Sequence, residues 1–455
     1  MQKHFARFEK APLNFGKSGL ALPSSRPWAP FVHKSAVERQ PKKPDTLCRM
    51  LQEAAAVVIG SGALGSSVAY HLAKGRLSPV VLIDQHELAS QTSPRAAGLS
   101  SAIRKSELMT RLARLGIEKI RGFASETGEE MVYFQPGSLR IARTSGHEQQ
   151  LRGDVERGQR LGVNIDLVSP AKAQERMPFL ETAGIRAATY VPEDIYLEPG
   201  QVPRGYVRAT AKLGGTLLPN TTVTGFGVKD GGIRSVLTGR GEIRTSIVVD
   251  AAGAWTRLVG SFAGARAGAI ATRHQLIITQ PIPGVEPHHA ITRVVDCNVY
   301  VRPCDGGLML GGYESDPLQL DMAALPAEFS IDDMPLDLAV LRGLIDRVAD
   351  QFPVLRAIAV REHRGGLPTM TADGEHIVGP LPGIRGLYVA GGCCVGGLTI
   401  APIIGDLLAE WIVSGQPRID LSPLSPSRPA VQTADETALR EDCRRQYAFH
   451  YQSQV

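Results

Sequence analysis

Residues 54–84 constrain the fold of this chain more than any other stretch, because they read as one strand–turn–helix–strand unit. Residues 54–59 form an unbroken apolar run, which is typical of a strand buried on both faces. Three glycines follow in G-x-G-x-x-G spacing, and a helix with an apolar stripe begins near Leu64. A second apolar strand, 80–83, ends at Asp84. The pattern predicts a doubly wound α/β unit.

Each part of this unit has a mechanical role in binding a dinucleotide. Gly60 allows a tight turn, Gly62 lets a pyrophosphate approach the backbone, and Gly65 lets helix and strand pack closely. The amino terminus of the helix offers unpaired N–H groups to phosphates. Asp84 follows the last glycine by about 20 residues, where a carboxylate accepts hydrogen bonds from ribose hydroxyls. A chance glycine-rich turn is the alternative. The dinucleotide contacts that we predict in this unit are Gly60, Gly62, Ala63, Leu64, Gly65, Asp84 and Gln85.

The net charge of the 455-residue chain, +5, arises in its amino-terminal arm. Residues 1–49 hold ten Lys or Arg and three Asp or Glu, a net +7 that leaves the rest of the chain at −2. The rest of the chain therefore lacks the basic footprint of a nucleic-acid-binding protein, and we expect no nucleic-acid partner. The arm is rich in proline and aperiodic, so we expect it to be disordered. A targeting segment, a partner-binding tail and a mis-called start before Met50 remain alternatives.

Cysteine spacing and hydropathy exclude other classes of protein. No pair of cysteines shows the C-x-x-C spacing of a metal site, and nothing suggests a disulfide framework, so we expect no metal. This usage is typical of a reducing compartment, and we expect a cytoplasmic location. No apolar run is long enough to cross a bilayer, so no transmembrane segment is predicted. The six cysteines are Cys48, Cys297, Cys304, Cys393, Cys394 and Cys443.

The nucleotide-binding unit is not continued directly along the chain. After Asp84 come a loop of small residues, 90–98, and a helix near 105–127, instead of further strand–helix pairs. A buried strand, 246–250, leads into Ala252 and Gly253, where a ligand can lie against the backbone. A later strand, 386–390, leads into a glycine-rich loop and a helix near 399–414. The first sheet is therefore predicted to be assembled from separated segments.

Several motifs in their order resemble the D-amino-acid oxidase family of FAD enzymes, near its sarcosine and dimethylglycine dehydrogenase branch. They are VVIGSGALGSSVAYHLAK with Asp84, ASQTSPRAAGL, VVDAAGAW, VYVRPCDGGLMLGGYE, and RGGLPTMTADGEHIVGPLP followed by GLYVAGGCCVGGLTIAPIIG. The likeness covers roughly residues 50–417, and the carboxy-terminal CRRQYAFHY also resembles tails of that branch. The resemblance implies an α/β (α+β) fold, in which a glutathione-reductase-type Rossmann FAD domain is interleaved with a mixed-sheet substrate domain.

This fold implies a division of the chain into alternating segments. We predict FAD-binding segments at 50–110, 186–265 and 362–417, substrate-domain segments at 111–185 and 266–361, a disordered basic arm at 1–49 and a carboxy-terminal tail at 418–455.

The resemblance also implies further FAD contacts and a non-covalent cofactor. The early loop would pass the flavin, and the late glycine-rich loop would bring backbone N–H groups to its ring. Arg95 stands where dimethylglycine-dehydrogenase relatives carry a histidine bonded to FAD, and Gly365-Gly366-Leu367 replaces the linking cysteine of monomeric sarcosine oxidases. The FAD contacts in these loops are Ser93, Arg95, Ala96, Ala252, Gly253, Gly391, Gly392, Gly396, Gly397 and Leu398.

Five residues are candidates for the chemistry, each with an ordinary structural role as the alternative. An arginine suits a substrate carboxylate because its fork is bidentate, and Arg302 and Arg273 are the leading candidates, followed by Arg95. His274 is placed to accept a proton from the substrate, and Tyr300 to line the pocket. Relatives with an arginine just after the strand proline are matched here by Cys304.

Together these features predict an FAD-dependent enzyme that oxidises an N-methylated or secondary amino acid, a small-molecule substrate. The alternatives are a D-amino-acid or (hydroxy)proline dehydrogenase, an FAD-bound subunit of a larger complex, and a NAD(P)-dependent dehydrogenase, against which the interrupted sheet argues. Oxygen, a flavoprotein and a quinone all stay open as the electron acceptor.

Overall fold

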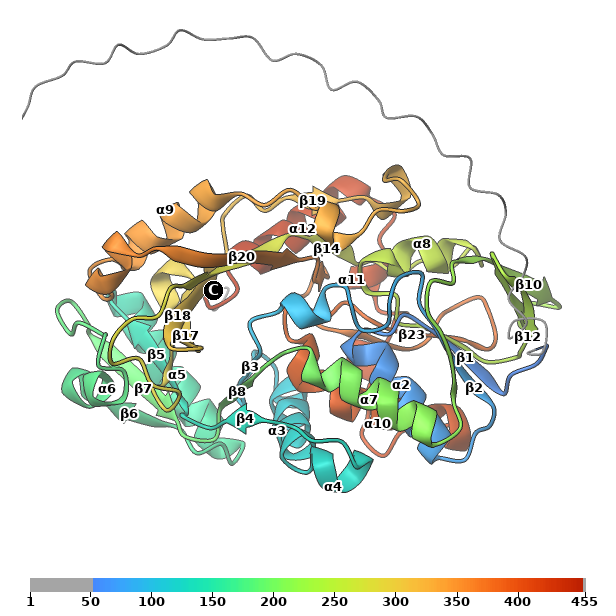
Figure 1. Cartoon of the computed structure of the whole chain (residues 1–455), viewed down its shortest axis with the longest axis horizontal. Coiled ribbons are helices and arrows are strands. Elements are labelled where there is room, and N and C mark those ends of the chain that lie inside the picture. Colours follow the sequence, from blue (N-terminus) through green and yellow to red (C-terminus); the bar gives the residue numbers. More distant parts are fainter. Residues whose placement is uncertain (1–51, 453–455) are drawn as a thin grey trace, which may run out of the picture. The chain divides into compact units, whose positions relative to one another are not determined.

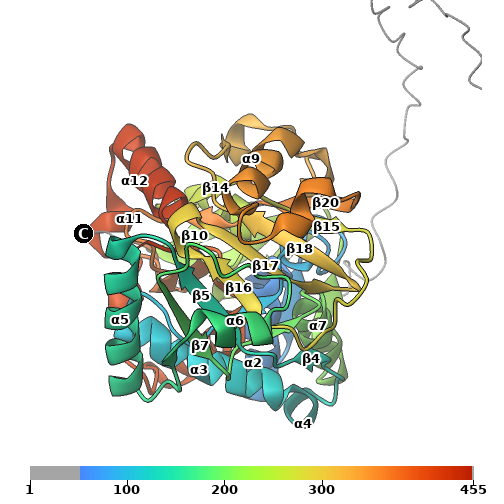
Figure 2. The same cartoon turned by 90° about the vertical axis from the view of Figure 1, so that its left-hand side faces the viewer.

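The protein is described by a computed structural model that covers residues 52–452 (Figures 1 and 2), so the predictions for residues 1–49 and Cys48 lie outside the described part. Its first sheet has six strands in the order β22-β23-β13-β1-β2-β9. Neighbours are parallel except β22 and β23, which run antiparallel. The strands are β1 (Ala56–Ile59), β2 (Val80–Ile83), β9 (Thr216–Leu218), β13 (Val248–Asp250), β22 (Ile377–Pro380) and β23 (Leu387–Gly391). As predicted, the sheet gathers segments far apart in the sequence.

Both faces of this sheet are covered, which explains why its strands are apolar throughout. On one face Ala56 and Val58 of β1 pack with a layer of helices, and on the other Val57 and Ile59 pack with a three-stranded meander. The helices include α2, α7 and α10, which lie together in Figure 1. The covering elements are α2 (Ala63–Lys74), α3 (Glu107–Arg121), α7 (Gln201–Lys212), α10 (Gly397–Ser414), β10 (Val223–Lys229), β11 (Gly232–Thr238) and β12 (Gly241–Arg244).

Helix α10 is apolar because it is a core element between α2 and α3. In residues 52–452 it is the one helix whose length and composition would allow it to cross a membrane, yet 61% of its 18-residue window is buried inside the structure. Gly405 and Gly116 mark the close approaches. A Cβ at Gly405 would lie 2.1 Å from Ser67 Oγ of α2, and one at Gly116 of α3 would lie 1.9 Å from the Thr399 carbonyl oxygen.

The second sheet has eight strands in the order β20-β15-β18-β17-β16-β5-β7-β6. Helices α6 and α9 cover one face, as Figure 2 shows, and the opposite face presents His274 and Tyr300. Only β16 and β5 run parallel. The elements are β5 (Ser138–Ala142), β6 (Asp166–Val168), β7 (Ala187–Val191), β15 (His274–Thr279), β16 (Ile291–Val294), β17 (Val299–Cys304), β18 (Gly307–Gly312), β20 (Val360–Gly366), α5 (Ser145–Arg160), α6 (Pro170–Arg176) and α9 (Leu338–Val348).

Short elements join the two sheets. They are α4 (Phe123–Thr127), α8 (Thr256–Ser261), α11 (Pro429–Gln432), α12 (Glu436–Ala448), β3 (Leu99–Ser100), β4 (Tyr133–Phe134), β8 (Ile195–Leu197), β14 (Ile270–Thr272), β19 (Gln319–Leu320), β21 (Thr369–Met370), and the 3-10 turns Ser93–Arg95 and Gly253–Trp255. The helix expected near 105–127 is divided at Gly122 into α3 and α4.

Three elements pack with the domain other than the one predicted for their residues. β7, predicted within segment 186–265 of the FAD domain, pairs with β5 and β6 in the second sheet. α3, whose larger part was predicted in substrate segment 111–185, packs on α10. β20 pairs with β15 through Gly366, past the boundary at 361. Backbone pairing and helix packing between distant segments decide these memberships, and neither leaves a local signal in the sequence.

Asp250, at the end of β13, makes stability depend on pH. It is fully buried, and Oδ1 accepts a hydrogen bond from the Ala252 N–H at 3.1 Å. The Ala252 N–H and the Thr256 side chain favour the carboxylate, but burial outweighs both. Burial raises the pKa of Asp250 to about 8. The folded protein therefore keeps a proton that the unfolded chain releases above its ordinary pKa, and stability at this site is lost as pH rises toward 8.

We predict that Asp250→Asn removes this loss, because an amide of the same shape does not titrate. The wild type should lose up to about 1.4 kcal/mol per pH unit between about pH 4 and 8 relative to the variant. Thermal unfolding at several pH values measures the difference, with exposed Asp166→Asn in β6 as the control. Parallel pH profiles for wild type and Asp250→Asn would contradict the prediction.

Candidate active site

Two joined cavities lie at the carboxyl end of the first sheet. Their volumes are about 560 Å³ and 400 Å³. They share walls from the turn after β1, the early loop and the turn after β13, namely Gly62, Thr92, Ser93, Ala251 and Gly253. An elongated ligand can therefore extend from one cavity into the other. The carboxyl edge of parallel strands is the usual ligand position in such sheets.

The smaller cavity has the features of a dinucleotide site. Gly60 has φ +98°, and a Cβ there would lie 2.4 Å from the Ala251 carbonyl oxygen, so only glycine fits. α2 starts directly after Gly62, which has no side chain to cap its N–H groups. Asp84 Oδ2 accepts hydrogen bonds from Ser61 N at 2.8 Å and Ser61 Oγ at 2.6 Å. Of the predicted contacts, Gly60, Gly62, Asp84, Gln85, Ser93, Ala252 and Gly253 line this cavity.

The larger cavity receives the other predicted cofactor contacts. α10 begins here at Gly397 without a side-chain cap, so its positive dipole end faces the space. Two of the predicted cofactor contacts, Gly65 and Gly392, line neither cavity. Both allow close packing of neighbouring parts of the chain. A Cβ at Gly65 would lie 1.8 Å from the Gly60 carbonyl oxygen, and one at Gly392 would lie 2.7 Å from Thr371 Cγ2. Lining this cavity are Gly62, Ala63, Leu64, Ser93, Arg95, Ala96, Gly253, Gly391, Gly396, Gly397 and Leu398.

These residues fit FAD. Gly60 and Gly62 leave a cradle that a Cβ would fill, the α2 terminus suits the pyrophosphate, and Asp84 suits a ribose. The amino terminus of α10 suits the part of the flavin that gains negative charge on reduction. The smaller cavity would thus hold the ADP half of FAD and the larger one the flavin.

His274 and Tyr300 face the larger cavity from the second sheet. The His274 Nε2 lies 3.0 Å from the Tyr300 hydroxyl, and its Nδ1 lies 2.9 Å from the Tyr447 hydroxyl. Tyr447 in turn donates to Glu314 Oε2 at 3.0 Å. Burial lowers the pKa of His274 to about 4, so the imidazole is neutral near pH 7 and one ring nitrogen can accept a hydrogen bond.

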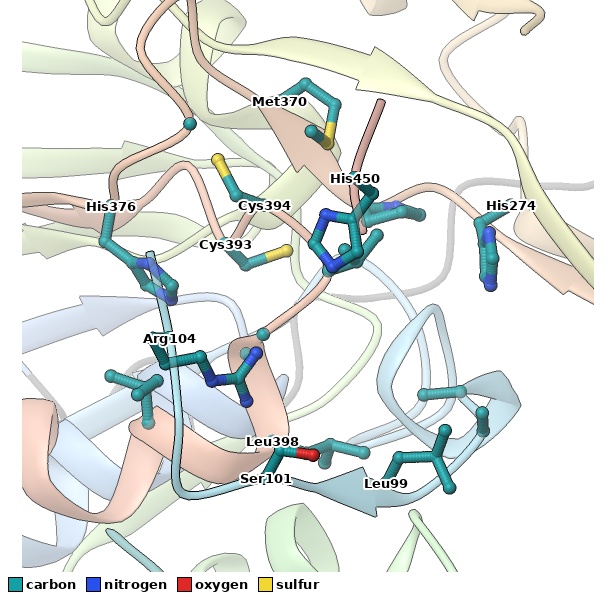
Figure 3. A pocket seen from close by; sticks show the side chains of 18 of the residues that line it. Leu99, Ser101, Arg104, His274, Met370, His376, Cys393, Cys394, Leu398 and His450 are labelled. Carbon is teal, nitrogen blue, oxygen red and sulfur yellow. The ribbon is translucent and has the colours of Figure 1, made fainter. Parts of the chain in front are cut away.

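The carboxy-terminal tail supplies part of this wall. Tyr447 of α12 is fully buried, and His450 stacks on Tyr313 at 4.4 Å between ring centroids. Tyr313 also stacks on His274 at 5.0 Å, so the three rings form a continuous aromatic wall. Figure 3 shows His450 between His274 and Cys393 in the view across the cavity. The sequence analysis predicted no site residue in the tail. The resemblance of the tail to those of the dehydrogenase branch was the signal that could have pointed to it.

Arg104 is the cavity arginine that sequence reasoning missed. Its Nη2 donates to Thr399 Oγ1 at 3.1 Å, its Nε is buried without a partner, and no described carboxylate pairs with it. Burial and the neighbouring Arg293 guanidinium lower the pKa of Arg104. His376 lies beside it in Figure 3, is 2% exposed, and has no partner on either ring nitrogen. Burial lowers the pKa of His376 to about 3, so Arg104 faces a neutral ring.

Arg302 and Arg273, the predicted carboxylate ligands, line neither cavity. Arg302 Nε donates to the Ala97 carbonyl at 2.8 Å, Nη1 donates to that of Pro303 at 2.6 Å, and the guanidinium lies 4.6 Å from the Tyr196 ring centroid. Arg273 donates to the Pro335 carbonyl at 2.9 Å. Arg273 Nη2 also lies 3.7 Å from Glu314 Oε1, and the other oxygen of this carboxylate accepts from Tyr447. In this structure both arginines are therefore bonded within the protein and neither lines a cavity.

Arg95 keeps its predicted place at the cavity wall but is bonded elsewhere. Its Nη2 pairs with Asp332 at 2.5 Å, and its Nη1 donates to the carbonyls of Ser90 and Gln91. An arginine offers no nucleophile for a bond to flavin.

We therefore predict that FAD is held without a covalent bond. Acid precipitation of the purified protein should leave the yellow colour in the supernatant, and its absorption spectrum should be that of free FAD. Matched precipitation of a protein with covalently bound flavin is the control. Colour that stays with the pellet, and on a flavin peptide after digestion, would contradict the prediction.

Comparisons with known proteins agree with this geometry. The family profile described as "DAO: FAD dependent oxidoreductase" matches residues 55–411. Mouse (Mus musculus) mitochondrial sarcosine dehydrogenase is 30% identical over 87% of this chain and 43% of its own length. Rat (Rattus norvegicus) mitochondrial dimethylglycine dehydrogenase is 30% identical over 90% and 48%. The chain thus spans about half the length of these curated relatives.

Solved structures share the fold. L-Proline dehydrogenase from P.horikoshii aligns with a TM-score of 0.75 at 24% identity, covering 83% of this chain and 97% of that one. Glycine oxidase from Geobacillus kaustophilus aligns with a TM-score of 0.73 at 22% identity, covering 83% and 99%. The predicted fold class is confirmed by the family match and these neighbours. The FAD cofactor is confirmed by the family match. The chain belongs to the DAO family of FAD-dependent oxidoreductases.

Proposed function

We propose that this protein oxidises the carbon next to nitrogen in an N-methylated or secondary amino acid. One observation carries the proposal: Arg104, which has no carboxylate partner among residues 52–452, shares a cavity with the neutral His274–Tyr300 pair. An amino acid carries a carboxylate and an amine. A site that binds it therefore needs a fixed cation for the carboxylate and a hydrogen-bond acceptor for the amine. The sarcosine and dimethylglycine dehydrogenases among the relatives carry names of such substrates.

The reaction breaks a C–H bond, and the nitrogen lone pair forms a C=N bond as the hydride leaves. When bound, FAD supplies the hydride acceptor. The imine product then reacts with water to give an aldehyde and the shortened amine. The lone pair is available only after the ammonium has lost its proton, so deprotonation must come first.

The residues of the chain bind and orient the substrate and favour its neutral amine. The Arg104 guanidinium is planar and stays charged inside the protein, and it suits a carboxylate in two parallel hydrogen bonds. The Tyr300 hydroxyl, bonded to His274 Nε2 at 3.0 Å, and the buried neutral imidazole disfavour a second cation beside them, so the amine binds after it has lost its proton to solvent. Tyr447 holds the other ring nitrogen and so fixes the orientation of His274. The aromatic wall excludes water from the amine.

Anaerobic reduction of the bound flavin tests the proposal. The purified protein is mixed with sarcosine, dimethylglycine, N-methylproline, proline and D-alanine, and flavin absorbance is followed. We expect an N-methylated or secondary amine to bleach it. Bleaching by D-alanine or proline alone would favour a D-amino-acid or (hydroxy)proline dehydrogenase, and a flavin that no amine bleaches would favour a subunit of a larger complex. Reoxidation by oxygen, a flavoprotein or a quinone then identifies the acceptor.

We predict that Arg104→Gln weakens binding of the carboxylated amine by about 10- to 100-fold, the effect of losing a charge-assisted hydrogen bond. An amine without a carboxylate should lose no affinity, which separates carboxylate binding from general damage. Arg111→Gln, an exposed arginine of α3, is the matched control. Anaerobic titration of the flavin spectrum measures both dissociation constants. Equal losses for the two amines would contradict the assignment.

A further inference from the structure

A second group of arginines lines the larger cavity, from the second sheet. Arg140 of β5 and Arg293 of β16 are directly paired across two neighbouring parallel strands, and both line the cavity with Arg104. Like charges directly opposite each other destabilise a sheet unless something neutralises them. Arg293 is 6% exposed, so water screens its charge poorly. This arrangement is costly without a counter-ion.

The described carboxylates at this end of the cavity neutralise only part of the charge. Asp154 pairs with Arg140 at 2.6 Å and with Arg157 at 2.8 Å, so one carboxylate serves two arginines. Asp194 lies 3.9 Å from Arg293 and also accepts hydrogen bonds from Ser138 Oγ and the Ala102 N–H.

The other charged groups on the cavity wall are accounted for separately. Asp373 pairs with Arg428 at 2.6 Å, and Arg95 pairs with Asp332 at 2.5 Å. Lys105 and Glu375 interact electrostatically, each favouring the charged form of the other. What remains is four guanidinium groups, of Arg104, Arg140, Arg157 and Arg293, against the carboxylates of Asp154 and Asp194, a surplus of two positive charges.

The surplus charges line one cavity. Arg104, Arg140 and Arg293 all line it together with His450, and Arg140 and Arg293 are paired across neighbouring strands. The Arg104 and Arg140 cations also contribute to the lowered pKa of His450, after burial as the main cause. One substrate carboxylate would neutralise half of the surplus, and a substrate with two would neutralise all of it.

We propose that the substrate is an amino acid with two carboxylates, one bound by Arg104 and the second by Arg140 and Arg293. The inference rests on the proposed function and names the substrate class for the same cavity. N-Methylglutamate and N-methylaspartate have the required chemistry. Single carboxylates such as sarcosine would still enter, but would neutralise only half of the positive surplus around Arg104, Arg140 and Arg293.

A pair of substrates with the same shape tests the charge requirement. Anaerobic reduction of the holoenzyme is followed with N-methylglutamate and with N-methylglutamine, whose amide removes one charge. We expect the dicarboxylate to bind at least about tenfold more tightly, as a charge-assisted contact predicts. Equal or weaker binding of the dicarboxylate, with bleaching by both, would overturn the inference and leave the proposed function standing. Bleaching by no amine would instead overturn the proposed function.

A variant locates the second site. Arg140→Gln should reduce the preference for N-methylglutamate over N-methylglutamine to about one. Arg152→Gln is the matched control on α5, because Arg152 pairs with Glu148 and lines neither cavity. A preference that survives in Arg140→Gln would overturn the placement. Should that variant fold poorly, the wild-type holoenzyme is titrated with glutarate and glutaramate, and equal perturbation of the flavin spectrum would count against the inference.

Discussion

The fold depends on close contacts between backbone segments that have no side chain between them. At the end of β1, Gly60 adopts φ +98° against the Ala251 carbonyl, and Gly65 brings α2 down onto Gly60 itself. These contacts join β1 and α2 to the turn after β13, which lies almost 200 residues further along the sequence. They also leave the carboxyl edge of the sheet free of side chains, and the two cavities share their walls there, at Gly62 and Ala251. The cofactor space is a direct consequence of this packing.

Burial acts differently on the charged groups that surround that space. A histidine that loses water gives up its proton, so His274, His376 and His450 are neutral at the cavity. A guanidinium cannot do so within the physiological range, so Arg104 keeps its charge in the same surroundings. Desolvation thus leaves a charged guanidinium beside neutral imidazoles, and no carboxylate forms an ion pair with Arg104 among residues 52–452. This division suits a zwitterionic substrate.

Sequence reasoning succeeded where the signal was local and failed where it was not. Strand 138–142 and helix 170–176 were predicted at their observed limits, and the glycine spacing predicted the tight turn after β1, because hydrophobic period and turn chemistry are properties of adjacent residues. The candidate arginine Arg302 could not be placed in the same way, because its guanidinium donates to the Ala97 carbonyl, 205 residues away in the sequence, and lines neither cavity. Tyr447 was missed for the same reason, because its partner His274 lies 173 residues earlier.

The two sheets contribute different kinds of group to the site, and this limits what fold similarity can say about substrate. The first sheet contributes mainly backbone, glycines and helix termini, which any FAD enzyme of this architecture needs. The second sheet contributes side chains that line the larger cavity, such as His274, Tyr300, Arg140 and Arg293. Strand pairing tolerates changes in these side chains, since the ladder is made by backbone groups. Relatives of the same fold can therefore hold the cofactor alike and differ in substrate, and the pair Arg140–Arg293 is the part of the wall that distinguishes one substrate charge from another.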